Sequence, residues 1–211
     1  MSLDHLQRSE PASWLMTLPD GLSRQIMSST RIVHAARGVR VYDHGEPPGG
    51  IYRVVSGVVA VMSWDETPLI GHLLGPGSWF GETSALTRQP RSVTTMALTE
   101  ARLAYLPLPV IEEIADMQPD LWRGLAALSA ANSMIAVQTA HDLMLTRPED
   151  RVSAVLRRLG DSLGRDTPIP LSQEQLADMC VLSRGAVSRI LSRLESAGKV
   201  RRGYREIWWL G

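Results

Sequence analysis

Short apolar runs alternate with turn residues between about residues 30 and 107. The runs are rich in residues that favour strands, as in GIYRVVSGVVAVMSW and RSVTTMALTEARLAYLP, and the segments EPPGG and GPG interrupt them. This spacing predicts the hairpins of an antiparallel β barrel or jelly roll. Gly57 breaks the apolar stretch VSGVVAV, which is typical of a bulge or a tight turn between two strands.

After Pro109 the apolar positions change to the period of a helix. Residues 120–145 are rich in Ala, Leu and Met and contain no proline. Alternating steps of four and three separate the members of one seam: Leu121, Leu125, Leu128, Asn132, Ile135, Thr139 and Asp142. The seam predicts a long helix over about 112–145, packed either against its own barrel or against its copy in a homodimer. A polar residue on a seam fixes the register of two helices, so Asn132 favours the dimer, and we assign the first six seam residues to a dimer interface.

The segment TRPED, residues 146–150, ends this helix. Thr146 and Glu149 have the spacing of a capping box for a following helix. We therefore place a domain boundary near 143–148. Residues 1–145 form one predicted module that includes the long helix, and residues 146–211 form a second.

The second module has the pattern of two capped helices around a tight turn, LSQEQLADMCVLSRGAVSRILSRLESAGKV. Ser172 with Gln175 is expected to cap the first helix. Ser183 is expected to cap the second helix, and Gly198 is placed to end it. Two short helices joined by so few residues must cross at a steep angle, as in a helix-turn-helix.

The second of these helices separates apolar from basic positions. Its apolar face is made of Val187, Ile190, Leu191 and Leu194. The opposite face carries Arg184, Gly185, Ser188, Arg189 and Ser192. This pattern predicts a recognition helix in the major groove of double-stranded DNA, where an arginine donates two hydrogen bonds to a guanine edge. The segment VRRGYREIWWL then predicts two short strands around Gly203, as in a wing, whereas the alternative is a surface helix whose arginines only face solvent.

Charge follows the same division. The formal net charge of the chain is zero, but residues 1–145 hold ten arginines against fourteen acidic residues, which gives −4. Residues 146–211 hold twelve basic against eight acidic residues, which gives +4. A basic C-terminal module favours a polyanionic partner, although a solvated basic face gives the same pattern.

Two motifs resemble those of the Crp/Fnr family of bacterial transcription regulators, and the resemblance extends over roughly residues 12–211. LSQEQLADMCVLSRGAVSRILSRLE resembles the DNA-binding signature of the family, and FGETSALTRQPRSVTT resembles the phosphate-binding cassette of cyclic-nucleotide domains. The resemblance implies an α+β fold with an N-terminal antiparallel β barrel or jelly roll, a long dimerisation helix and a C-terminal winged helix-turn-helix. It also implies a palindromic operator and RNA polymerase as a partner.

In the cassette, the resemblance assigns the cyclic phosphate to Arg91 and the ribose 2′-hydroxyl to Glu82, with supporting hydrogen bonds from Gly81, Thr83 and Ser92. The chemistry agrees, because amides at a helix N-terminus favour an anion and a guanidinium adds charge-assisted hydrogen bonds. A carboxylate rejects a phosphate and accepts from a hydroxyl. We therefore expect a cyclic nucleotide effector, cAMP or cGMP, and no covalent cofactor. The alternative is a regulator that needs no nucleotide or answers another ligand, with Glu82 and Arg91 simply paired.

Two departures from the family pattern limit the resemblance. Members that respond to cAMP have a Thr-Ser pair on the long helix, where this chain has Ala136-Val137, so the base of the nucleotide stays open. Gly185 stands where the cAMP-receptor branch has a glutamate, and a glycine cannot accept from a cytosine amino group. The residues expected to contact DNA are Ser172, Gln173, Ser183, Arg184, Gly185, Ser188 and Arg189.

Other functions lack the residues that they need. Cys180 is the single cysteine, so the sequence provides neither a disulfide framework nor the cysteine set of Fnr-type oxygen sensing. We interpret His72 as an ordinary strand residue and not as a haem ligand, and the histidines lack the close His-x-His pair of a metal-dependent cupin. No set of nucleophile, base and orienting group occurs, so we expect neither an enzyme nor a metal site.

The location of the protein follows from what its sequence lacks. No apolar run reaches the roughly 18 residues that a membrane span needs. The polar segment MSLDHLQRSE at residues 1–10 is unlike a signal peptide. We therefore expect a cytoplasmic protein without a membrane partner.

Overall fold

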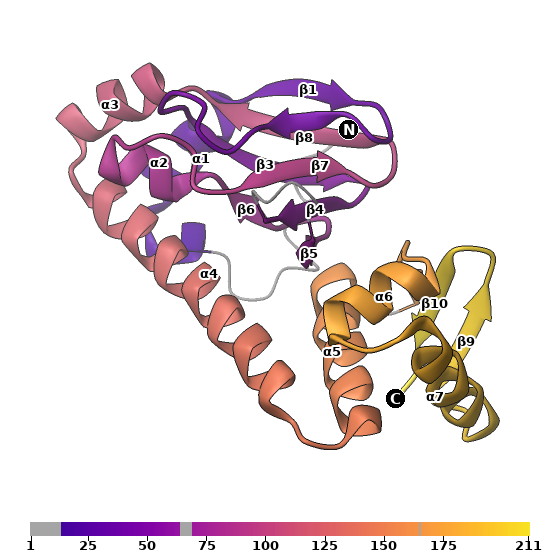
Figure 1. Cartoon of the computed structure of the whole chain (residues 1–211). Helices are drawn as coiled ribbons and strands as arrows, with labels where there is room; N and C mark the ends of the chain where they lie inside the picture. Colours follow the sequence, from indigo (N-terminus) through magenta and orange to yellow (C-terminus); the bar gives the residue numbers. More distant parts are fainter. Residues whose placement is uncertain (1–13, 64–68, 165) are drawn as a thin grey trace.

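The β-rich region forms two four-stranded antiparallel sheets that face each other as a barrel (Figure 1). The computed structural model describes residues 14–63, 69–164 and 166–211, so the segment 1–10 discussed above lies outside the described residues. The strands of the first sheet follow the order β1 (Arg31–Ala35), β8 (Ala101–Leu106), β3 (Ile51–Ser56) and β6 (Trp79–Phe80). The strands of the second sheet follow the order β2 (Arg40–Tyr42), β7 (Thr94–Ala97), β4 (Val59–Met62) and β5 (Ile70–Leu74). The predicted fold class, α+β with an N-terminal antiparallel barrel, is confirmed.

Gly57 makes the tight turn that its position in the sequence predicted. It lies between β3 and β4 with a φ of 88°, a conformation that favours glycine. A Cβ at this position would lie 2.3 Å from the carbonyl oxygen of Glu100, so a side chain is excluded by contact as well as by conformation.

Cross-strand pairs define the two faces of the second sheet. Tyr42, Thr95, Val61 and His72 are paired in one row across the four strands, so their side chains share a face. Tyr42 and Val61 pack in the core between the sheets, which makes this the inner face of the barrel. The neighbouring row, which points to the outer face, consists of Met96, Ala60 and Leu73.

Helices cover one end of the barrel and extend from it (Figure 1). They are the 3-10 helix η2 (Trp14–Thr17), α1 (Asp20–Ser28), α2 (Glu82–Thr87), α3 (Leu108–Met117) and the long helix α4 (Asp120–Met144). The long helix was expected over about 112–145; the structure divides that range between the end of α3 and α4. In the described part of the chain, no helix combines the length and the apolar character of a membrane span.

The first half of α4 is buried within its own chain. Leu121 and Leu125 are 0% exposed and Leu128 is 5% exposed, in a core that they share with Ile51 and Trp79. Side chains that are already covered by their own barrel are not available to a second copy. The assignment of these three leucines to a dimer interface was therefore wrong, because a helical period shows which face is buried but not what covers it.

The second half of α4 has a different surface. Asn132, Ile135 and Thr139 are half-buried and face a pocket of the barrel. The opposite face of the helix is apolar and open to solvent, with Met134 56% and Val137 59% exposed. Counting along this face, its apolar members follow helical steps of four, four, three and seven: Ala126, Ala130, Met134, Val137 and Met144.

The C-terminal part folds as the predicted helix-turn-helix with a wing. Its elements are α5 (Pro148–Leu163), α6 (Gln173–Cys180), α7 (Arg184–Ser196), β9 (Val200–Gly203) and β10 (Glu206–Trp209). Ser172 accepts from the backbone N–H of Gln175, whose side chain accepts in turn from the N–H of Ser172, so the predicted capping box is confirmed. Ser183 caps α7 by accepting from the N–H of Ala186, and Gly198 follows α7 with a φ of 69°. β9 and β10 pair as an antiparallel hairpin.

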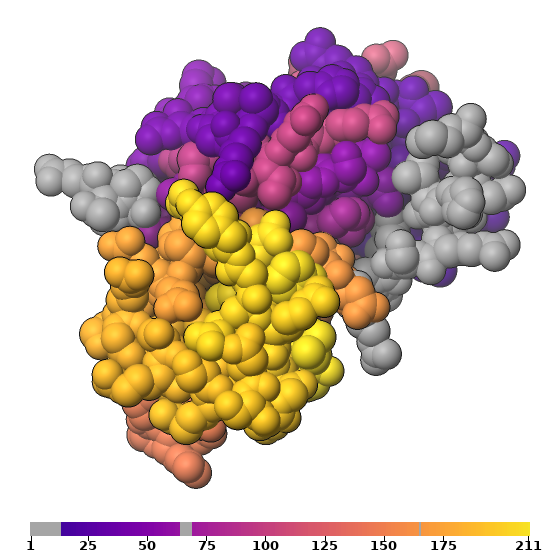
Figure 2. Space-filling view, turned by 90° about the vertical axis from the view of Figure 1, so that its right-hand side faces the viewer, coloured from indigo at the N-terminus to yellow at the C-terminus, as the bar shows by residue number. Residues whose placement is uncertain are grey.

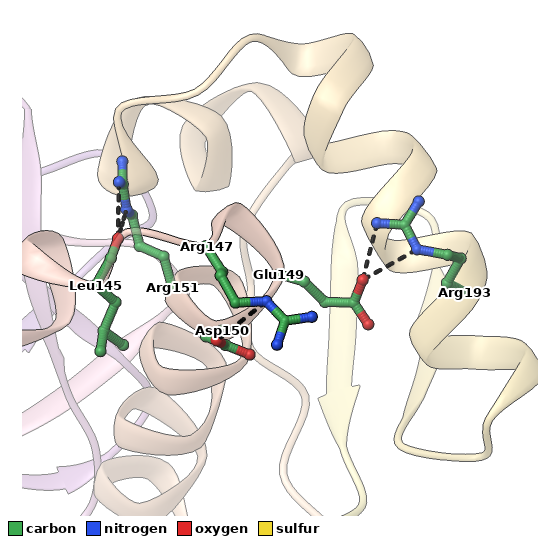
Figure 3. Close-up of polar contacts among 6 residues, drawn as sticks. All are labelled: Leu145, Arg147, Glu149, Asp150, Arg151 and Arg193. Atoms are coloured by element: carbon green, nitrogen blue, oxygen red, sulfur yellow. Dashed lines mark hydrogen bonds and ion pairs between the residues drawn. The ribbon is translucent and has the colours of Figure 1, made fainter.

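An arginine holds the linker between α4 and α5. α5 begins at Pro148 without a capping side chain, so the predicted capping box at Thr146 was wrong. Arg151 instead donates from Nε and Nη2 to the carbonyl oxygen of Leu145, at 3.2 and 2.9 Å (Figure 3). Its Nη1 donates to the carbonyl oxygen of Cys180 at 3.1 Å. One guanidinium thus joins the linker to the end of α6.

The C-terminal part packs on the outer face of the second sheet. Ile70 and Leu73 of β5 belong to the same buried cluster as Val152, Leu156 and Leu159 of α5. Figure 2 shows the contact from the side, with the C-terminal part in orange and yellow against the barrel. The two predicted modules therefore share a continuous apolar core in this arrangement.

Replacing Leu125 tests whether α4 is part of the barrel core. We expect Leu125→Ala to lower the free energy of unfolding by about 2–5 kcal/mol, because it removes buried methyl groups and leaves a cavity. Leu210→Ala is the matched control, since Leu210 is 52% exposed. Equilibrium urea unfolding followed by circular dichroism measures both, at low and high protein concentration. A loss that disappears at high protein concentration would place Leu125 in an intersubunit contact instead.

Candidate functional site

A pocket with a volume of about 420 Å³ opens between the barrel, α2 and α4. The inner face of the second sheet forms one wall, and the middle of α4 forms another. All five residues predicted to bind a ligand line it: Gly81, Glu82, Thr83, Arg91 and Ser92. The structure therefore brings the cassette residues together at one cavity, while their roles toward a ligand stay predictions.

Arg91 is a buried cation held by carbonyl oxygens. The residue is 4% exposed, and its Nη1 and Nη2 donate to the carbonyl oxygens of Gly81 and Gly50 at 2.9 and 2.8 Å. The guanidinium carbon lies 4.2 Å from the ring centre of Tyr42, a cation–π contact. These groups are neutral, and the ion pairs of the described residues do not include Arg91. The expected alternative, a simple Glu82–Arg91 ion pair, is not what these residues form.

Glycines create the space for this guanidinium. A Cβ on Gly49 would lie 2.5 Å from Nη2 of Arg91, and a Cβ on Gly81 would lie 2.8 Å from its Nη1. Gly81 also has a φ of 91° at the N-cap of α2. Side chains at these positions would displace Arg91, so the glycines fix where the positive charge lies.

Glu82 is the buried acid of the pocket, 4% exposed in the first turn of α2. Burial raises the pKa of its carboxyl, and hydrogen bonds from Asn132 and Thr83 partly oppose that rise. Asn132 also donates from Nδ2 to the carbonyl oxygen of Trp79 at 3.2 Å. This residue of the predicted seam therefore connects α4 to the pocket of its own chain.

A further group of polar residues joins the pocket wall to α4 and α5, and its central member, Arg158, was not singled out from the sequence. Arg158 donates from Nε to Asp142 Oδ2 at 2.7 Å, and its Nη1 lies 2.8 Å from Nδ1 of His72. All three are less than 10% exposed. His72 lies on a strand, β5, as expected, and its ring is buried against Arg158, a contact that the sequence did not predict. A signal was present in the sequence, since Arg158 interrupts the apolar face of a helix that continues with Leu159.

The predicted recognition helix presents its arginines to solvent. Arg184 and Arg189 are exposed, and Ser188 is half-buried between them. A groove of about 380 Å³ separates the start of α7 from the wing, and Ser172, Gln173 and Arg184 line it. Of the predicted DNA contacts, Ser183 and Gly185 are also exposed at the first turn of α7.

Other arginines of this module are engaged within it. Arg193 donates to Glu149 of α5 through Nε and Nη2, at 3.0 and 2.9 Å (Figure 3). Arg202 pairs with Glu195, and the guanidinium carbon of Arg201 lies 4.1 Å from the ring centre of Trp208. The basic residues thus divide into those that stabilise the module and those that face outward at α7.

The remaining chemistry that we considered from the sequence has little support in the geometry. Cys180 is buried, and burial raises the pKa of its thiol to about 12, so it is not a reactive thiolate. Within the described residues, no three His, Cys, Asp or Glu side chains are arranged to hold a metal ion.

Comparisons with known proteins match the two parts separately. Residues 32–118 match the cyclic nucleotide-binding domain family, and residues 150–210 match the Crp-like helix-turn-helix domain family. The cyclic AMP receptor protein of Thermus thermophilus is 32% identical over 176 residues, which cover 79% of this chain and 78% of that protein. A CRP-like cAMP-activated global transcriptional regulator of Mycobacterium tuberculosis is 25% identical over 173 residues, covering 78% of this chain and 77% of that protein.

The arrangement of the two parts also has a counterpart among solved structures. The c-di-GMP responsive global regulator CLP of Xanthomonas campestris superposes with a TM-score of 0.68 at 21% identity. The match covers 92% of this chain and all of that one. At this identity the likeness concerns the fold alone.

Proposed function

The chain belongs to the Crp/Fnr family of transcription regulators, and on that premise we propose that it is a dimeric, sequence-specific DNA-binding protein controlled by cAMP or cGMP in its barrel. The family consists of transcription regulators and not of enzymes, and the chain has both a cyclic nucleotide-binding domain and a Crp-like helix-turn-helix. The observation that carries the ligand proposal is the buried, carbonyl-held Arg91 in the same pocket as the buried Glu82.

The polar groups of the pocket are suited to a ligand that bears both a phosphate and a hydroxyl. A guanidinium has five N–H donors, and Arg91 gives one to each of two carbonyls, so three have no bond among the described residues. A phosphate supplies the missing negative charge and accepts from those donors and from the first amides of α2. Glu82 accepts from the ribose 2′-hydroxyl. Thr83 and Ser92 lie at the pocket rim and add hydrogen bonds.

The base of the nucleotide meets α4. The family resemblance places a Thr-Ser pair of cAMP-responsive members at this point of the long helix. In this chain the pocket has Ala136 there, flanked by Ser133 and Thr139. The hydroxyls of Ser133 and Thr139 donate to helix carbonyls one turn back, at 2.8 and 2.9 Å. They keep their lone pairs free to accept from a base, so both cAMP and cGMP stay in the proposal.

The second candidate is a regulator with another effector, or none. It rests on the fold shared with a regulator that responds to c-di-GMP. The buried cation of Arg91 favours a phosphate-bearing ligand in either case, so a free chain without any anion is the less favoured form.

The dimer that we propose forms along the exposed face of α4. Ala130, Met134, Val137 and Met144 give it an apolar stripe that is exposed in the part of the chain that the structure describes. Asn132, Ile135 and Thr139 face the pocket on the other side of the helix. Two α4 helices packed on this stripe give the pair the two-fold symmetry of a palindromic operator. The recognition helices then bind half-sites about 34 Å apart, one turn of DNA.

Each proposed module has its own function: residues 1–145 bind the ligand and form the dimer, and residues 146–211 bind DNA. At α7, Arg184 and Arg189 read base edges, while Ser183, Gly185 and Ser188 approach the duplex closely and Ser172 and Gln173 contact its phosphates. As a regulator of this family the protein acts in the cytoplasm, with RNA polymerase as its partner at promoters.

Removing the charge of Arg91 tests the ligand pocket. We expect Arg91→Met to weaken binding of cAMP and cGMP by about 100-fold or more, because it deletes at least two charge-assisted hydrogen bonds. Arg40→Met is the matched control, since Arg40 is exposed on the same barrel and pairs only with Asp43 among the described residues. Calorimetric titration with both nucleotides measures the affinities, and thermal unfolding verifies that both variants are folded. An affinity equal to that of the control would refute the role of Arg91.

Replacing Arg184 tests base reading by α7. Against a site selected from random DNA, we expect Arg184→Ala to lose about 1–3 kcal/mol of binding, and to lose little on a scrambled duplex. Arg193→Ala is the matched control on the same helix, because its guanidinium is bound to Glu149. Fluorescence anisotropy with both duplexes measures the affinities. If Arg184→Ala lost the same factor on both duplexes, Arg184 would contact phosphate and not a base.

A further inference from the structure

A buried arginine joins three parts of the chain that differ in function. Arg158 belongs to α5, in the DNA-binding module, and Asp142 belongs to the last turn of α4. His72 belongs to β5 of the barrel. The Arg158–Asp142 ion pair has side chains only 8% and 9% exposed, so solvent does not compete for it. The three groups form one contact in which Arg158 is the central member.

The contact lies at the edge of the second sheet, where α5 reaches a residue of the inner face. β5 is the outermost strand of the second sheet, next to β4 only. Leu73 faces outward and packs with α5, whereas His72 belongs to the inner row with Val61 and lines the ligand pocket. Arg158 therefore approaches from the side of α5 and meets a residue of the pocket wall. The register shift at β4–β5 lies next to this point, between Val61 and Met62.

The protonation of the contact is fixed by its members. A guanidinium only donates, so Nδ1 of His72 must accept and the ring proton lies on Nε2. Burial, together with the positive charge of Arg158, lowers the pKa of His72 to about 3. His72 is therefore neutral at pH 7, and Asp142 alone balances the charge of Arg158.

The guanidinium of Arg158 can bond to His72 and Asp142 at the same time only when these two residues are a fixed distance apart. Its Nε and Nη1 groups are rigidly spaced, so His72 and Asp142 must keep their present distance for both bonds to persist. The apolar contacts around them tolerate sliding far better than this planar group does. The two partners of Arg158 also belong to the two walls of the pocket. His72 lines the pocket directly, and α4 lines it through Ile135 and Thr139, about two turns and one turn before Asp142.

We propose that the Asp142–Arg158–His72 contact is the link through which the occupant of the barrel pocket controls the position of the DNA-binding module. A ligand that changes the spacing between β5 and α4 breaks one of the two bonds of Arg158 and releases α5 from the pocket wall. A ligand that holds the present spacing keeps α5 in place. This proposal rests on the proposed function, because that function supplies the ligand. The contact itself is present in the structure without a ligand.

The test uses variants that remove the link without leaving a buried charge. Asp142→Asn with Arg158→Met deletes both charges together, because deleting one alone would strand the other. His72→Leu removes the bond to the pocket wall and keeps the ion pair, so it serves if the double variant does not fold. Because His72 also lines the pocket, calorimetric titration verifies that this variant is saturated with nucleotide when the coupling is measured. The control pair, Glu149→Gln with Arg193→Met, deletes an exposed ion pair that joins α5 to α7 and includes none of the three linked residues.

The first readout is the coupling between ligand and DNA. In the full-length wild type, saturating cAMP or cGMP is expected to change the dissociation constant for the selected DNA by about 5–150-fold. In the double variant and in His72→Leu we expect that ratio to fall to within about twofold of one, while the control pair keeps the wild-type ratio. Neither Asp142 nor Arg158 lines the pocket, so the double variant still binds the nucleotide. A wild-type ratio in both link variants would overturn the proposal.

The second readout needs no ligand, and so separates the link from the proposed function. Hydrogen exchange of the free protein is expected to rise on the order of tenfold in β5 and in the last turn of α4 of the link variants, and to stay unchanged in α7. If wild type bound neither cAMP nor cGMP, the proposed function would fail, and this exchange pattern alone would decide the link. Unchanged exchange in β5 and α4 would overturn it.

Discussion

A buried positive charge, held by neutral groups in the same pocket as the buried acid Glu82, is the constraint that defines the candidate site. Arg91 is held by two carbonyl oxygens and an aromatic face, which orient the guanidinium but leave its unit charge uncompensated by them. Placing such a charge in a dry site is unfavourable unless an anion is near. Gly49 and Gly81 leave the space that this guanidinium occupies, because a Cβ at either position would collide with it. This buried charge is the observation on which the proposed anionic ligand rests.

The long helix turns this local constraint into a property of the whole chain. Its first half is a wall of the barrel core, and its middle carries Asn132, which supports Glu82 in the pocket. Its exposed face is open to a second copy, and its last turn carries Asp142, bound to the DNA-binding module. These contacts support the proposed link, in which a displacement of α4 at the pocket reaches the DNA-binding module. The two modules also share an apolar core. Such a displacement therefore shifts an equilibrium between two packed arrangements of the modules and does not detach the DNA-binding module from the barrel.

Local sequence patterns predicted the features that depend on residues close together in the chain. The caps at Ser172 and Ser183 and the turn at Gly57 are set by side chains and backbone within a few residues, and the structure has them in place. The cassette residues also line one pocket, but Arg91 is held there by the distant groups Gly50 and Tyr42. What depends on distant contacts was missed. The leucine seam of α4 has the same period whether its own barrel or a second copy covers it, and the barrel covers it. The roles of His72 and Arg158 require knowing that α5 lies against β5. Thr146 did not cap α5, because the proline at the start of α5 and the bonds of Arg151 hold the linker instead.

A crystal structure of the chain grown with cAMP, and another grown with cGMP, measures the central claim most directly. The account predicts the cyclic phosphate within hydrogen-bond distance of the Arg91 guanidinium and the first amides of α2, with the ribose 2′-hydroxyl on Glu82. A nucleotide bound away from this pocket, with Arg91 still engaged only by the carbonyls of Gly81 and Gly50, would contradict it.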